Sequence, residues 1–132
     1  MRRPFAPAAL PAAALLATLA LSLPSLAAEV EGRYRIDGRN PGDNAGRYTG
    51  EVAVTRTGET YQVAWIVSGQ KSIGTGLRTG DVLSVAYGTP QGGGLASPGI
   101  AVYQINPDGT LTGSFTLIGM KAKGLEAWTP AK

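Results

Sequence analysis

Residues 60–68 read TYQVAWIVS, and this stretch decides the fold class. Its large side chains recur at every second position, at Tyr61, Val63, Trp65 and Val67. Successive side chains of an extended chain point to opposite faces, so these four residues share one face. A run of β-branched and aromatic residues with a period of two predicts a half-buried β-strand.

Segments on both sides of this stretch carry the same period and are separated by turns rich in Gly, Pro, Asn and Asp. No helical stripe survives after the first 28 residues, because Gly or Pro interrupts almost every short window. The chain is therefore predicted to be all-β, a small up-and-down antiparallel barrel of about eight strands, with a two-sheet β-sandwich as the alternative. We predict strands over residues 32–38, 47–56, 60–68, 71–78, 82–88, 99–106, 110–117 and 121–129.

Two predicted loops interrupt the strands, residues 39–46 and the glycine-rich residues 89–98. Loops on a rigid scaffold often carry recognition, so both are candidate rim elements. Glycines also occur inside several predicted strands, where we expect them to mark bulges or barrel corners.

The first 28 residues have the pattern of a secretory signal peptide. Arg2 and Arg3 form a basic start, and the apolar run AAALLATLALSL precedes a cluster of small residues. We predict an N-terminal signal helix that is cleaved near Ala27 or Ala28, leaving a single β-barrel domain over residues 29–132. The apolar run is shorter than the ~20 residues that a membrane-spanning helix needs. We therefore expect a periplasmic or secreted protein with no stable membrane insertion after cleavage.

Charge and composition exclude several classes of function. Removal of Arg2 and Arg3 lowers Lys+Arg from 12 to 10 against 9 Asp+Glu, so the net charge falls from +3 to +1. The basic residues are scattered, and we expect no nucleic-acid partner. The chain contains no His and no Cys, which removes the usual nucleophile systems and the usual zinc, copper and iron ligands. We expect a protein that is not an enzyme and uses no metal or cofactor.

Five residues are candidates for a cavity or its rim: Trp65, Tyr87, Tyr103, Glu126 and Trp128. In a barrel, aromatic side chains on the apolar faces of several strands point inward, where they either fill the core or line a ligand cavity. Glu126 has the least polar surroundings of the acids, and we expect it to pair with an arginine inside the barrel or at its rim.

Short motifs of turn glycines and strand aromatics extend over essentially the whole mature domain: GRYRIDGRNP at 32–41, YTGEV at 48–52, YQVAW at 61–65, GTG at 74–76, DGTLTG at 108–113 and GLEAWTP at 124–130. By these motifs the chain resembles a group of small exported bacterial all-β proteins that are often automatically named fibronectin-binding proteins. That resemblance implies adhesion to an extracellular-matrix protein. The hairpin rhythm is also similar to that of avidin-type and lipocalin-type barrels, which implies a fold and no particular ligand residue.

The leading hypothesis from the sequence is an exported, non-enzymatic binding module that contacts a protein partner through its rim loops, residues 39–46 and 89–98. One alternative is a carrier that holds a small hydrophobic ligand inside the barrel, anchored by Trp65, Tyr87 and Tyr103. Another alternative is a hydrolase inhibitor that blocks an enzyme with a loop or a strand edge.

Overall fold

The computed structural model describes residue 4, residues 29–44 and residues 46–132, and within them the chain is all-β. Apart from residue 4, the predicted signal peptide and its cleavage point lie outside the described residues. The described strands are β1 (Gly32–Arg39), β2 (Arg47–Thr57), β3 (Thr60–Val67), β4 (Gln70–Thr79), β5 (Val82–Gln91), β6 (Gly94–Ile105), β7 (Leu111–Leu117) and β8 (Gly124–Pro130).

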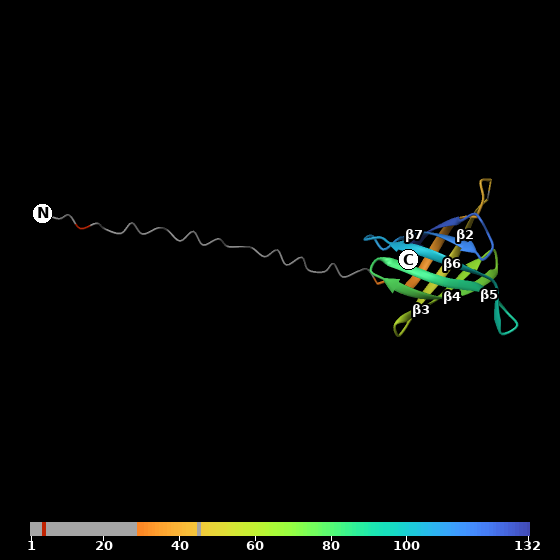
Figure 1. The fold of residues 1–132 in the computed structure, drawn as a ribbon, viewed down its shortest axis with the longest axis horizontal. Helices are drawn as coiled ribbons and strands as arrows, with labels where there is room; N and C mark the ends of the chain where they lie inside the picture. The colour runs from red at the N-terminus through yellow and green to blue at the C-terminus, as the bar shows by residue number, and fades with distance from the viewer. Residues whose placement is uncertain (1–3, 5–28, 45) are drawn as a thin grey trace.

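The eight described strands form one closed barrel, in which each strand pairs antiparallel with the next and β8 pairs back with β1 (Figure 1). The closing ladder runs from Tyr34 opposite Pro130 to Arg39 opposite Leu125. Closure leaves none of the described strands with a free edge for pairing with another chain. The predicted up-and-down barrel is confirmed, and the alternative of a two-sheet sandwich is wrong.

The barrel interior is packed by the strand faces that the alternation predicts. In β3, Tyr61, Val63 and Trp65 are at most 6% exposed, whereas Ile66 on the opposite face is 53% exposed. Burial of these large apolar side chains is the main favourable contribution to folding in a domain without disulfides. The same cluster takes buried side chains from the N-terminal segment and from every other strand except β4: Val30, Tyr34, Ile36, Val52, Val54, Leu83, Val85, Ala101, Tyr103, Ile105, Leu111 and Trp128.

The two ends of the barrel differ. At one end, which we call the closed end, Val30 enters the core with no exposed surface, and the Tyr34 hydroxyl donates a 2.6 Å hydrogen bond to the Val30 carbonyl. The chain enters the barrel at this end, on the left of Figure 1. At the opposite end, which we call the open end, lie the connections β1–β2, β3–β4, β5–β6 and β7–β8. The open end therefore gives access to the interior between its loops.

The predicted loop over residues 89–98 is wrong. β5 continues to Gln91 and β6 begins at Gly94, so most of this stretch is a paired hairpin. Gly92 and Gly93 have φ values of 57° and 80°, the positive values that a tight two-residue hairpin turn requires. The glycine-rich composition that suggested a loose loop instead supplies a turn, with a register shift between Tyr87 and Thr89.

Most in-strand glycines do not mark bulges, which was one of the two roles expected of them. The register shift at Gly88 is the one irregularity recorded among the described ladders. Four other inward-facing glycines lie directly across from inward-facing aromatic residues, and a Cβ on any of these four would overlap the ring of its partner. These cross-strand pairs are Gly38 with Tyr48, Gly99 with Tyr87, Gly113 with Tyr103, and Gly124 with Phe115. Each glycine lets a ring lie against the neighbouring strand's backbone, as in the aromatic rescue of strand glycines.

Replacing such a glycine should destabilise the barrel. In Gly113→Ala the new Cβ would overlap the Val102 carbonyl and the Tyr103 ring, and backbone cannot move aside as a flexible side chain can. We expect a loss of roughly 1–3 kcal/mol in the free energy of unfolding, measured by urea denaturation. Gly46→Ala is the control, because nothing lies within 4 Å of its added Cβ. Equal stability of the two variants would contradict the packing role of Gly113.

Candidate functional site

A cavity of about 310 Å³ opens into the barrel interior at the open end, and we call it the cup. Its volume is at the lower limit of the roughly 300–1,000 Å³ typical of small-molecule sites. The cup is surrounded by aromatic side chains, rim polar groups and a single acid: Asn40, Tyr48, Trp65, Val67, Ser68, Gln70, Ser72, Tyr87, Tyr103, Phe115 and Glu126. The interior is thus packed at the closed end and hollow at the open end.

Glu126 is the one charged residue that is buried among the described residues, at 8% exposed. Three side chains donate hydrogen bonds to its carboxylate. The Tyr48 hydroxyl donates to Oε1 at 2.6 Å, the Tyr103 hydroxyl to Oε2 at 2.7 Å, and the Trp128 Nε1–H to Oε2 at 2.8 Å. The expected arginine partner is therefore wrong. Neutral donors satisfy this carboxylate, and an ionised carboxylate, which only accepts, suits three donors.

The strand register explains how two tyrosines reach one carboxylate. Tyr48, Gly38, Glu126, Gly113 and Tyr103 lie directly opposite one another in a row across β2, β1, β8, β7 and β6. Glu126 therefore has a glycine on each side and a tyrosine beyond each glycine. Because glycine has no side chain, each ring can extend over it, and each hydroxyl reaches Glu126 at hydrogen-bond distance. We call this arrangement the tyrosine–glycine row.

The tyrosines of the cup hold their protons strongly. Burial, reinforced by the negative charge of Glu126, raises the pKa of Tyr87 to about 12. The same two causes, burial first, raise the pKa of Tyr48 and of Tyr103 well above the usual value near 10. These hydroxyls consequently remain protonated donors across the physiological pH range.

Aromatic pairs form the walls and floor of the cup. Trp65 and Tyr87 lie with ring centroids 5.4 Å apart on one side. Tyr48 and Phe115 lie 6.4 Å apart in an edge-to-face arrangement. Below them Trp128 has no exposed surface, with its ring centroid 4.1 Å from that of Tyr103. Such tilted and edge-to-face contacts favour fixed ring positions.

The structure places four of the five sequence candidates, Trp65, Tyr87, Tyr103 and Glu126, around the cup. The fifth, Trp128, lies beneath the cup and holds Glu126 from below. Sequence reasoning missed two cup residues with large side chains, Tyr48 and Phe115. Tyr48 is in phase with the buried Val52 and Val54 of β2, and this period-2 relation was the available signal.

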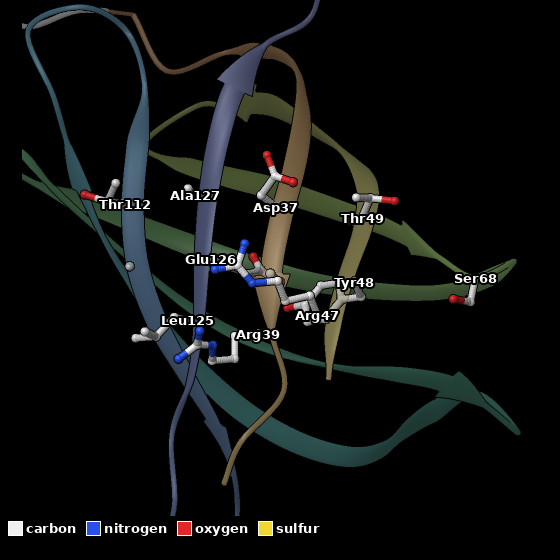
Figure 2. A pocket seen from close by; sticks show the side chains of 12 residues that line it. Asp37, Arg39, Arg47, Tyr48, Thr49, Ser68, Thr112, Leu125, Glu126 and Ala127 are labelled. Atoms are coloured by element: carbon white, nitrogen blue, oxygen red, sulfur yellow. The ribbon is translucent and has the colours of Figure 1, made fainter. Parts of the chain in front are cut away.

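A larger hollow, of about 850 Å³, lies against the outer wall over β7, β8, β1 and β2 (Figure 2). Its outward side chains are exposed, including Asp37, Arg39 and Arg47. Arg39 lies directly opposite Arg47 in the β1–β2 ladder, a like-charge pair that solvent screens. Tyr48 and Glu126 line this hollow as well as the cup, but every other polar side chain of the hollow is exposed to solvent. In the cup these two residues are joined by aromatic walls that exclude water from a ligand. We therefore take the cup as the candidate site.

The residues that the structure describes contain no group of three or more His, Cys, Asp or Glu side chains that could hold a metal ion. No helix in this part of the chain is both long enough and apolar enough to span a bilayer.

Comparison with known proteins adds no relative. No protein-family model matches the chain, and no curated protein matches it either. The function therefore has to be argued from the cup itself.

Loss of one donor to Glu126 should destabilise the barrel. Tyr103→Phe removes a hydrogen bond to a buried carboxylate, and hydrogen bonds to charged groups contribute about 1.5–3 kcal/mol. We expect a loss of that size in the free energy of unfolding, measured by urea denaturation. Tyr61→Phe is the matched control, because the structure gives this buried tyrosine no hydrogen bond from its hydroxyl to any described residue. Its loss of stability should therefore be clearly smaller than that of Tyr103→Phe. Equal losses in the two variants would refute the role assigned to Tyr103.

Alkaline pH should unfold the protein through its tyrosines. Burial in the fold raises the pKa values of four tyrosines above the usual value near 10: Tyr34, Tyr48, Tyr87 and Tyr103. A group with a raised pKa contributes stability that is fully present below its unfolded pKa and is lost as pH rises through the folded one. The urea midpoint should therefore fall above about pH 10, with tyrosinate absorbance rising together with unfolding. The Tyr61→Phe variant retains only these four tyrosines, and tyrosinate that forms in it at pH 10 while its circular dichroism stays native would contradict this.

Proposed function

We propose that this protein is an exported, non-enzymatic binding protein that holds a small ligand in the cup. One observation carries the proposal: a buried carboxylate, satisfied by three neutral donors, lies within an aromatic cavity that opens to solvent. Burying a carboxylate costs free energy that an apolar side chain in the same place would not. A role in ligand binding accounts for that cost, whereas a role in packing does not.

The absence of enzymatic activity rests on the chemistry available in the cup. Glu126 is the one acid among the described lining residues, and the sequence contains no His and no Cys. Carboxylate-only hydrolysis uses a pair of acids on opposite sides of the scissile bond. A single carboxylate already engaged by three donors is better suited to recognition.

Export is part of the proposal because of the first 28 residues, which have the basic start, apolar run and small residues of a signal peptide. Binding to a matrix protein is the second candidate. It is supported by residues 40–46, which form a rim loop between β1 and β2 at the open end. The second rim loop that this candidate expected, residues 89–98, is instead largely a paired hairpin, so its support is lost. The inhibitor alternative loses its strand-edge mode, because the described strands close on one another.

Native mass spectrometry of the protein purified from the periplasm tests the proposal. We expect a reproducible extra mass on the wild-type chain. Ser72→Phe, which fills the cup from β4, should remove that mass, and Ser84→Phe, on the exposed face of β5, should retain it. A bare wild-type chain that also shows no thermal shift with a charge-diverse set of small molecules would refute the proposal.

A further inference from the structure

The charges that face the cup are unbalanced. Its described lining includes one acid, Glu126, and neither Lys nor Arg. The three groups that hold the Glu126 carboxylate are neutral hydroxyls and an indole, so they satisfy hydrogen bonds without cancelling the charge. In a partly desolvated cavity an uncancelled negative charge attracts a cation more strongly than in water.

The carboxylate also has room for one more donor. A carboxylate has about four lone-pair sites, two on each oxygen. Oε2 accepts from both Tyr103 and Trp128, whereas Oε1 accepts from Tyr48 alone. The fourth site, on Oε1, is left for a ligand, because Glu126 itself lines the cup. A ligand that carries an N–H bond matches this site.

The walls of the cup favour the same charge. The side chains of Trp65, Tyr87 and Phe115 surround the cavity together with that of Tyr48. Aromatic faces carry partial negative charge, and they attract a cation that lies within about 6 Å of a ring centroid. The rings also offer apolar surface to the body of a ligand. An ammonium group on a small apolar body therefore matches both the carboxylate and the aromatic walls of the cup.

We propose that the cup binds a small organic ammonium ion, a protonated primary or secondary amine with an apolar body. Its N–H donates to Oε1 of Glu126, and its body packs against Trp65 and Phe115. The rim polar groups Ser68, Gln70 and Ser72 lie where a second polar group of the ligand would emerge. This assignment rests on the proposed function and adds the chemical class of the ligand.

Three probes that share a phenylalkyl body and differ in charge test whether the cup prefers a cation. The probes are 2-phenylethylammonium, the neutral 2-phenylethanol and the anionic 3-phenylpropionate, titrated calorimetrically at pH 7 into protein expressed from the complete sequence. We expect the ammonium to bind at least about ten-fold more tightly than the alcohol, and the carboxylate to bind most weakly. Equal or tighter binding of the alcohol or the carboxylate overturns the inference and leaves the binding function standing.

Glu126→Gln tests whether Glu126 is the group that binds the ammonium. The substitution keeps the size of the side chain and removes its charge, so ammonium binding should weaken by about ten-fold while binding of the alcohol changes by less than about three-fold. Glu51→Gln, on the outer face of β2, should change neither. If Glu126→Gln retains the full preference for the ammonium, the assignment to Glu126 is wrong. If that variant does not fold, the three probes on the wild-type protein decide the question alone.

The two proposals fail in different ways. If none of the three probes binds but the periplasmic protein carries an extra mass, the ligand is released and its charge is determined. A cation supports the inference, and a neutral or anionic ligand overturns it. Where no probe binds and the protein is bare, the binding function and the ligand class fall together.

Discussion

The tyrosine–glycine row is the constraint on which the rest of the site depends. Glu126 lies on the closing strand β8 with Gly38 on one side and Gly113 on the other. The absence of a side chain at these two positions lets Tyr48 and Tyr103 extend over them to the carboxylate. The row spans five adjacent strands, so it exists only because β8 returns to β1 and closes the barrel. The burial of Glu126 between these tyrosines therefore depends on the closure of the barrel.

The same glycines explain why the barrel is hollow at one end. Near the closed end the interior is filled by branched and aromatic side chains, including Ile36, Val63 and Leu83. Near the open end glycine replaces such residues on the inner faces of β1, β6, β7 and β8. Rings that lie back over glycine line the wall and leave the centre free. A small domain needs its packed half for stability, since it buries a modest share of its surface.

The electrostatic design of the cup follows from burial. Each tyrosine hydroxyl loses solvent and lies near a carboxylate, and both causes favour the protonated form. The tyrosines therefore remain donors, and the Glu126 carboxylate accepts from two of them. Since the hydroxyls are neutral, the charge is positioned without being cancelled, which leaves the cup with a net negative field.

The local pattern of the sequence predicted much of the fold. Period-2 alternation in residues 60–68 and in the neighbouring segments predicted about eight strands and their buried faces, and turn residues predicted an up-and-down order. The pattern failed at residues 89–98, where glycines form a hairpin turn inside a paired ladder. It failed again at Glu126, where the sequence suggested an arginine partner and the partners are Tyr48, Tyr103 and Trp128.

By itself the sequence determined which side chains point inward, because alternation along an extended chain is a local property of the backbone. Only the tertiary structure decided which inward side chains meet. Tyr48 and Glu126 are 78 residues apart along the chain, and their contact depends on the registers of two ladders, β1–β2 and β1–β8. Register is set by the packing of all the strands together, and a shift of one residue would turn Glu126 to the solvent face.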